Sequence, residues 1–569
     1  MLVLAPLLIM GLLLAYLNGM DTSGPAADDP PGQFPASTPV ATGYPSVDMG
    51  HQVANDPPTP ATPPSIPFTA PPEPEIALPP QAVTVMVRDL FTDQPLAGAT
   101  VALGDRLAQT DDGGQVVFRQ VKEGAPLTVQ AQGHAMGETV YRGEFSLEIA
   151  LRPTILTGVV SDLTTGQPIS STLIYVGDLI ATTDEEGAYR LEDLPPEPVL
   201  TVKASGYRKT TLQVGPGFDP HIALEPFQVK GIYIPFGLLY RPERVRELID
   251  LVDRTELNAI VVDVKGDRAR LAYASQVPLA QEIEAELPGH MDLQELLQLC
   301  RERDIYTIAR LVVFKDTVLA AKRPDLAVKR PDGGLWMDRE RLYWVDPFRQ
   351  ETWDYNIAIA KEVAEMGFDE IQVDYVRFPS DGDIRHTRYS QPSTLESRTQ
   401  AIRGFFARFQ EALRPLGVFT SADVFGLTVW VEEGDMGIGQ RLEDVAPYVD
   451  YLCPMVYPST FALGGLGYAN PALHPYQVVY RSYQRGAART PTRIRPWLQH
   501  FSIRGVEYTV ERLLAQKQAA FDVGACGWTF WSARGAYNEE VFEVEEQDEG
   551  ERLLRRHPPQ TTHRPSLIP

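Results

Sequence analysis

EIQVDYVRFPSDG, residues 370–382, is the stretch from which the fold of this chain can be predicted. Its first residues alternate between polar and apolar side chains, which predicts a β-strand with Glu370, Gln372 and Asp374 on one face. The amphipathic segment QETWDYNIAIAKEVAEMGF precedes this strand, and SRTQAIRGFFARFQEALRPL follows it. A strand between two helical segments is typical of a parallel sheet built from βα units.

The same pattern recurs along the chain after Pro226. Strands are expected at 231–235, 259–265, 306–314, 370–378, 418–426, 451–457, 495–501 and 524–531. Amphipathic segments such as RPERVRELIDLVDRT and VEYTVERLLAQKQAAFDVG separate them. Eight βα units within about 300 residues predict a closed (β/α)8, or TIM, barrel over residues 228–535.

The region before the barrel contains an internal duplication that aligns without a gap. VRDLFTDQPLAGATVALGD, from Val87, matches VSDLTTGQPISSTLIYVGD, from Val160. Alternating apolar residues and turn signals predict two tandem antiparallel β-sandwiches, at 81–153 and 154–227. The repeats resemble carboxypeptidase regulatory-like, or transthyretin-like, modules. That resemblance implies an architectural role, and carbohydrate binding is the alternative.

Both ends of the chain have compositions unlike those of the predicted domains. The apolar run LVLAPLLIMGLLLAYL predicts a signal peptide or an N-terminal membrane anchor within residues 1–20. Residues 21–80 are rich in proline and are expected to form a disordered linker, and a disordered tail is expected at 536–569. We therefore expect an extracytoplasmic protein, secreted or tethered to the cell membrane.

Composition excludes several classes of function. A net charge of -24 and a pI near 4.9 argue against nucleic-acid binding, which usually needs a basic face. No glycine-rich phosphate loop follows the first predicted strand, so we expect no nucleotide partner. The three cysteines, Cys300, Cys453 and Cys526, lie in apolar stretches without metal-ligand spacing and read as buried core thiols. No cofactor and no obligatory metal are predicted.

Two aspartates stand out as candidate catalytic residues. In a TIM barrel the functional groups gather where the strands end, and Asp374 should point into the barrel mouth from the fourth strand. Arg377 follows it closely and is expected to act as its charge partner. Asp423 occupies the matching place in VFTSADVFG, the fifth strand. Two inward carboxylates are the minimum equipment for glycoside hydrolysis.

Further side chains at the strand ends are candidates for binding a sugar. Aromatic rings can stack on sugar faces, and arginine, lysine and amide groups can bind hydroxyls. For Asp263 the alternative is a structural salt link to Lys265. The predicted substrate-binding residues are Asp263, Lys265, Arg310, Arg377, Tyr457, Trp497, Gln499, Trp528 and Trp531.

The barrel also resembles a known family, the bacterial putative glycosyl hydrolase domain. KGIYIP, the DEIQVDYVRFPSDG strand, SADVFG, RPWLQHF and GWTFWSA carry the resemblance. It implies a TIM barrel of the glycoside hydrolase class. The paired carboxylates Asp374 and Asp423, the aromatic residues at the strand ends and the expected export together predict a glycoside hydrolase acting on cell-wall or extracellular polysaccharide. A non-catalytic glycan-binding or envelope-scaffolding protein is the alternative function.

Overall fold

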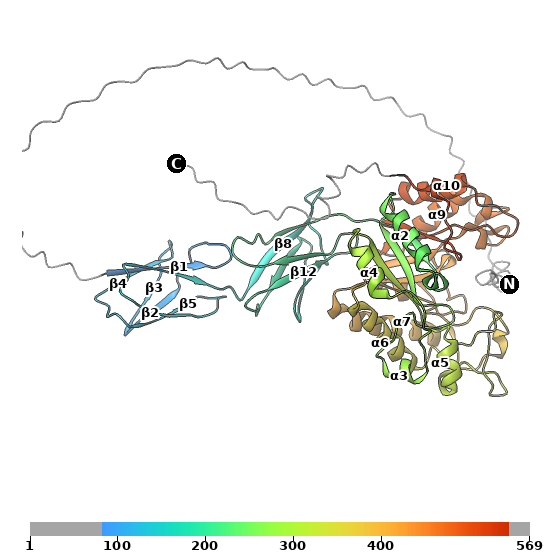
Figure 1. Cartoon of the computed structure of the whole chain (residues 1–569), viewed down its shortest axis with the longest axis horizontal. Helices are drawn as coiled ribbons and strands as arrows, with labels where there is room; N and C mark the ends of the chain where they lie inside the picture. Colours follow the sequence, from blue (N-terminus) through green and yellow to red (C-terminus); the bar gives the residue numbers. More distant parts are fainter. Residues whose placement is uncertain (1–81, 545–569) are drawn as a thin grey trace, which may run out of the picture.

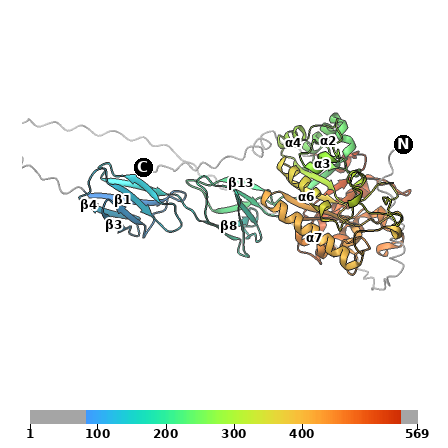
Figure 2. The same cartoon turned by 90° about the horizontal axis from the view of Figure 1, so that it is seen from below.

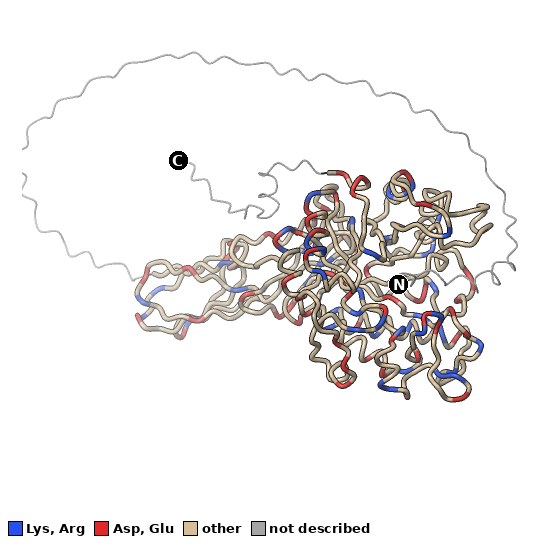
Figure 3. The backbone as a smooth tube through the Cα atoms, turned by 45° about the vertical axis from the view of Figure 1, so that its right-hand side comes forward, with Lys and Arg blue, Asp and Glu red and all other residues tan. Residues whose placement is uncertain are grey.

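The computed structural model describes residues 82–544, which form three bodies in a row (Figures 1 and 2). Two β-sandwiches come first and a larger barrel follows, as predicted from the sequence. Within this described range no helix is long and apolar enough to cross a membrane. The predicted N-terminal segment and linker lie outside the described residues. Acidic and basic residues are interspersed along all three bodies (Figure 3).

The first sandwich packs a sheet of order β4-β1-β7 against a sheet of order β3-β2-β5-β6. Val83, Val85 and Val87 alternate inward along β1 and are fully buried, because a strand points successive side chains to opposite faces. The strands are β1 (Ala82–Asp89), β2 (Thr100–Leu103), β3 (Arg106–Gln109), β4 (Gln115–Arg119), β5 (Pro126–Gln130), β6 (Gly137–Val140) and β7 (Ser146–Leu151).

The second sandwich repeats this arrangement, with sheets of order β11-β8-β14 and β10-β9-β12-β13. Most pairs are antiparallel, but the first and last strands of each module pair in parallel, β1 with β7 and β8 with β14. The strands are β8 (Leu156–Asp162), β9 (Leu173–Val176), β10 (Leu179–Thr182), β11 (Ala188–Leu191), β12 (Val199–Lys203), β13 (Thr210–Gln213) and β14 (His221–Leu224).

The second sandwich packs against the barrel at the N-terminal ends of the barrel strands. Lys203 donates to the carbonyl of Val418 and forms an ion pair of 2.8 Å with Asp450. The backbone N–H of Gly206 donates to the hydroxyl of Tyr451 at 2.8 Å. Since functional groups of this fold gather at the opposite, C-terminal end, this module contributes nothing to the barrel mouth.

The barrel is a closed ring of parallel strands, because β19 pairs with both β18 and β20. The seventh strand is split around Pro496, which has no backbone N–H to donate to a ladder. The barrel strands are β15 (Val229–Ile234), β16 (Ala259–Lys265), β17 (Tyr306–Val312), β18 (Glu370–Asp374), β19 (Phe419–Phe425), β20 (Tyr451–Met455), β21 (Arg493–Ile494), β22 (Trp497–Gln499) and β23 (Gly527–Trp531).

Helices surround the strands and bury their apolar stripes against the outer face of the barrel (Figure 1). In α7, for example, Ile402, Phe405 and Phe409 recur at helical spacing and are fully buried. The α-helices are α2 (Pro242–Asp253), α3 (Pro278–Glu282), α4 (Leu293–Arg301), α5 (Thr317–Lys322), α6 (Gln350–Glu365), α7 (Leu395–Leu413), α8 (Leu442–Val445), α9 (Pro475–Ala487) and α10 (Val510–Asp522).

Packed chain continues beyond the barrel boundary expected near residue 535. A short 3-10 helix, η10 (Glu539–Val541), follows, and Val541 and Phe542 are buried in the main core. Val544 forms a β-bridge with Thr255. The first residues of the predicted tail therefore belong to the barrel. All three cysteines are buried and free, as the sequence predicted.

Candidate active site

Asp374 is the last residue of β18 and stands at the C-terminal end of the barrel. The next residue, Tyr375, has a φ of 54°, a left-handed conformation that a tyrosine rarely adopts. Its backbone N–H turns back and donates to Asp374 Oδ1 at 2.6 Å. Such strained backbone is frequently found at functional sites, since the surrounding structure must hold it in place.

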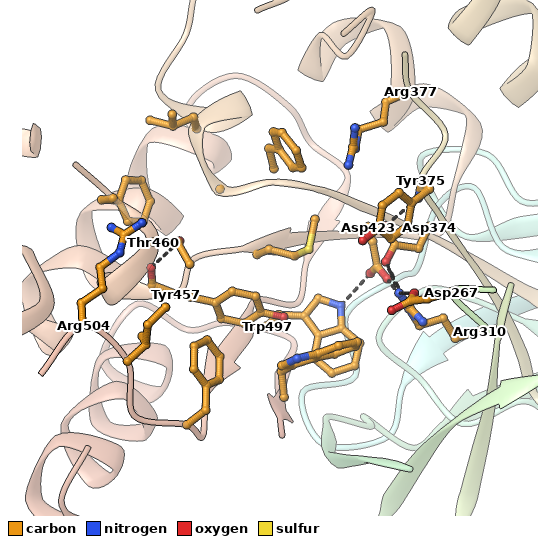
Figure 4. A pocket seen from close by; sticks show the side chains of 18 residues that line it. Asp267, Arg310, Asp374, Tyr375, Arg377, Asp423, Tyr457, Thr460, Trp497 and Arg504 are labelled. Carbon is orange, nitrogen blue, oxygen red and sulfur yellow. Dashed lines mark hydrogen bonds and ion pairs between the residues drawn. The ribbon is translucent and has the colours of Figure 1, made fainter. Parts of the chain in front are cut away.

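A cavity that is open to solvent begins at this carboxylate. Figure 4 shows its two parts. Most of the charged side chains gather at one end, and an apolar wall leads away from them towards Arg504. The charged end is lined by Asp267, Arg310, Asp374, Arg377 and Asp423, and the apolar wall by Phe425, Leu427, Met455, Phe461, Phe501 and Ile503.

Arg310, on β17, holds the carboxylates of the charged end together. Its Nη1 lies 2.6 Å from Asp263, and its Nη2 lies 2.6 Å from Asp374 and 3.3 Å from Asp267. Its Nε is 3.1 Å from Asp374 Oδ2 and 3.8 Å from Asp423 Oδ2. Because one nitrogen reaches an oxygen of each, Asp374 and Asp423 are close neighbours.

Asp423, on β19, is buried, and its surroundings shift its pKa. Burial, and then the charge of Asp374, raise its pKa well above the ordinary value, although Arg310 and a hydrogen bond from Trp497 oppose the shift. Trp497 Nε1 donates to Asp423 Oδ1 at 2.6 Å. A carboxyl group with a raised pKa beside an ion-paired carboxylate is the pairing that general acid catalysis requires.

Aromatic rings form the floor beside these carboxylates. Tyr233 stacks on Trp531 with ring centroids 3.9 Å apart, and Trp497 meets Trp531 edge to face at 5.5 Å. The guanidinium carbon of Arg310 lies 5.0 Å from the centroid of Trp531. The hydroxyl of Tyr233 donates to Asp263 at 2.5 Å. The aromatic and charged parts of the floor therefore hold each other in position.

The structure brings most of the predicted site residues together at this cavity. Those that line it are Asp374, Asp423, Arg310, Arg377, Tyr457, Trp497 and Trp531. One predicted relationship is corrected in part. The charges of Arg377 and Asp374 interact, but Arg377 forms no ion pair with Asp374, and the ion pair is made by Arg310 on the neighbouring strand. The sequence could not show this, because the pairing depends on which strands are adjacent.

Lys265 does not reach the cavity, and it forms no salt link with Asp263. It is fully buried and bonds Asp316 at 2.6 Å and Asn356 at 2.7 Å. The register of β16 against β17 shifts between Asp263 and Lys265, so strict alternation fails there. Asp263 itself stays inward, but it binds Arg310 and thus positions that side chain.

Gln499 and Trp528 were also predicted to bind substrate, and the structure places both away from the cavity. The amide of Gln499 bonds the Ser459 hydroxyl at 2.9 Å and the Phe501 carbonyl at 2.7 Å, which fixes a loop at the rim. Trp528 points outward from β23 into the core under the helices, because its neighbours in the alternation, Thr529 and Trp531, point inward.

The apolar wall of the site was not predicted, and neither were two polar residues, Asp267 and Tyr233. Asp267 lines the cavity two positions beyond Lys265, and Arg310 and Lys315 lower its pKa although burial opposes this. Tyr233 could have been found from alternation in KGIYIP.

Between residues 82 and 544 no three His, Cys, Asp or Glu side chains converge as metal ligands would. A guanidinium occupies the centre of the acidic cluster instead.

Comparison with known proteins identifies a family. The family model described as "Putative glycosyl hydrolase domain" matches residues 231–537. That span includes every barrel strand except the first residues of β15, together with the whole cavity. No curated protein matches the chain.

Several solved structures are similar to parts of the chain. A hypothetical protein from Ruminiclostridium thermocellum is 39% identical over 34% of this chain and 97% of its own, with a TM-score of 0.31. The PgaB (BpsB) glycoside hydrolase domain from Bordetella bronchiseptica is 15% identical over 56% and 100%, with a TM-score of 0.41. An α-galactosidase from Thermus thermophilus is 13% identical over 64% and 74%, with a TM-score of 0.35.

Proposed function

The chain belongs to the family described as "Putative glycosyl hydrolase domain", and we propose that it hydrolyses glycosidic bonds with Asp374 and Asp423 as the reacting carboxylates. The single observation that carries this proposal is the shared guanidinium of Arg310, which reaches both groups. It keeps two inward carboxyl groups side by side at the barrel mouth, and the pKa of one of them, Asp423, is raised. The proposed substrate is a polysaccharide of the cell wall or the extracellular space.

The two carboxyl groups divide the chemistry between them. Asp423, which burial favours in its protonated form, gives its proton to the oxygen of the leaving sugar as the C–O bond breaks. Asp374, held by Arg310 and the Tyr375 N–H, attacks the anomeric carbon and forms a glycosyl ester. Water then cleaves the ester, with Asp423 taking up its proton. Neighbouring carboxyl groups are typical of this double displacement, which retains the configuration of the sugar.

The proposal is tested by digesting a panel of polysaccharides and identifying the products by mass spectrometry. Asp374→Asn should lower the hydrolysis rate at least about 1,000-fold, because the nucleophile is lost while the size of the side chain stays the same. Asp325→Asn, an exposed aspartate outside the cavity, serves as the control and should hydrolyse normally. Full activity of Asp374→Asn would refute the mechanism. Glycan binding without any product would instead favour a binding protein.

We also propose that this activity is located outside the cytoplasm. The apolar run at residues 2–17 and the proline-rich residues 21–80 support this location. A fusion of residues 1–80 to a reporter enzyme that works only after export would test it. Activity of the reporter is expected, and a reporter that stays inactive inside the cell would contradict the proposal.

A further inference from the structure

Arg377 lies in an aromatic cage beside the two catalytic carboxyl groups. The guanidinium carbon is 4.7 Å from the ring centroid of Tyr375, 5.0 Å from that of Trp344 and 4.6 Å from that of Phe425. Only 3% of the residue is exposed, and it lines the same cavity. Figure 4 shows the side chain reaching from above into the space over Asp423.

This buried cation lacks the partner that such groups normally have. Nη1 donates to the carbonyl of Phe378 and to the hydroxyl of Ser380, both at 3.1 Å. No carboxylate of the described chain forms an ion pair with Arg377, and its Nε and Nη2 make no hydrogen bond there. Burial lowers its pKa, although the charges of Asp374, Asp381 and Asp338 oppose the shift without forming an ion pair. A buried charge is destabilising unless it is paired, so its retention at the cavity needs a reason.

The other two arginines buried in the barrel show the contrast. Arg310 is enclosed by the aspartates described above, and Arg495 forms an ion pair with Glu370 deeper in the barrel. Both are therefore neutralised by the protein itself. Arg377 is left as a cation at the wall of the cavity, with the Nε–Nη2 edge of its guanidinium unused.

We propose that Arg377 binds the carboxylate of a uronic acid unit, so that the substrate is an acidic polysaccharide cleaved next to that unit. This inference rests on the proposed glycoside hydrolase function and names its substrate class. The N–H groups of Nε and Nη2 are parallel donors that match the two oxygens of a carboxylate. The surrounding rings shield the pair from water and strengthen it.

A basic amino sugar is the competing substrate class, because aspartates are numerous at this end of the cavity. Asp263, Asp267 and Asp374 are already bound by Arg310, so they offer little to an ammonium group. The unpaired charge at the cavity wall belongs to Arg377. The lack of an ion-pair partner at Arg377, rather than the total charge of the cavity, therefore favours an anionic substituent at this part of the wall.

The test compares each acidic oligosaccharide with its own carboxyl-reduced form, which differs only in having CH₂OH for COO⁻. Oligosaccharides of polygalacturonate, alginate and hyaluronan are the probes, and the ratio of kcat/KM for acidic over reduced substrate is measured. The wild-type ratio should be at least about 10 for the cognate sugar, and Arg377→Gln should remove most of it. Arg377→Lys keeps the positive charge but lacks the two parallel N–H donors, and it should give an intermediate ratio.

A matched control and a folding check accompany these variants. Arg408→Gln changes an exposed arginine on α7 that pairs with Asp354, and it should leave the ratio unchanged. Thermal unfolding shows whether each variant is folded. If Arg377→Gln is not folded, the ratios of the wild type and of Arg377→Lys still test the inference. A wild-type ratio near 1 for every probe overturns it.

Calorimetric binding to Asp374→Asn separates this inference from the proposed function. Binding of acidic but not reduced oligosaccharides, without cleavage of any probe by the wild type, would support the role of Arg377 and refute the hydrolase. Cleavage of neutral polysaccharides at the same rate by the wild type and by Arg377→Gln would support the hydrolase and refute the role of Arg377. Preference for amino sugars or for sulfated sugars would overturn the assignment of a carboxylate.

Discussion

Arg310 is the residue on which the charges of the cavity depend. It is 1% exposed, and three aspartates, two from β16 and the loop after it and one from β18, contact its guanidinium within 3.3 Å. Removing one partner of a buried ion pair is far more harmful than removing both, because a charge is left without compensation. The sequence marked Arg310 as a binder of sugar hydroxyls, whereas the structure assigns it the positioning of Asp374.

The raised pKa of Asp423 predicts how activity depends on pH. The proton donor is present below its pKa and is lost as the pH rises through it, so hydrolysis should persist at pH values where an ordinary aspartate is ionised. Asp423→Asn should lower kcat about 100- to 10,000-fold on substrates with poor leaving groups and remove the fall on the basic side. Rates measured between pH 4 and 9 provide the check.

A leaving group that needs no proton supplies the control for that experiment. Dinitrophenyl glycosides of the cognate sugar should lose much less activity in Asp423→Asn than natural oligosaccharides do. An equal loss on both substrates would show that Asp423 is not the general acid.

Strand alternation was a reliable guide at some elements and misleading at others. Along β18 and β19 it correctly placed Asp374 and Asp423 inward. Along β16 it failed for Lys265, because a bulge there changes the register by one residue. Bulges and the choice of neighbouring strands depend on how the ring closes, and no local pattern in one strand encodes them.

Closure of the ring between β15 and β23 depends on one glycine. Gly527 has a φ of 118°, and a Cβ atom there would lie 2.1 Å from the carbonyl oxygen of Val229. Gly527→Ala should therefore lower the free energy of unfolding by about 3 kcal/mol, from backbone strain and overpacking. Chemical denaturation measures this change.

Gly237→Ala is the matched control for that substitution. A Cβ atom at Gly237 would meet no heavy atom within 4 Å, and its backbone is not left-handed. This variant should be as stable as the wild type or slightly more so, by up to about 1 kcal/mol. A similar loss for both glycines would argue against a special role of the β15–β23 junction.

At the scale of the whole molecule, the duplicated modules have diverged in what they contact. Lys203 of the second module binds Asp450 of the barrel, whereas the aligned residue of the first module, Gln130, is exposed. In Figure 1 the second module lies between the first module and the barrel. The second module closes the end of the barrel opposite the cavity, which fits the architectural role expected from the sequence.

Lys203→Met should therefore destabilise the barrel even though it lies in another module. Asp450, 17% exposed in its side chain, would keep its charge without its cation, and we expect a loss of about 2 kcal/mol. Calorimetric unfolding and limited proteolysis near residues 225–230 are the measurements. Gln130→Met, at the aligned position of the first module, should change neither the unfolding temperature nor the rate of proteolysis. If both variants melt like the wild type, the two bodies unfold independently.

The sequence by itself determined the duplication, the TIM barrel and the inward aspartates, because periodicity and turn residues are local properties of the chain. Only the tertiary structure decided that Arg310 rather than Arg377 pairs with Asp374. It also removed Lys265, Gln499 and Trp528 from the cavity and left Arg377 as an unpaired cation. Ion pairs and burial are set by distances between strands far apart in the chain, and these distances arise only when the barrel closes.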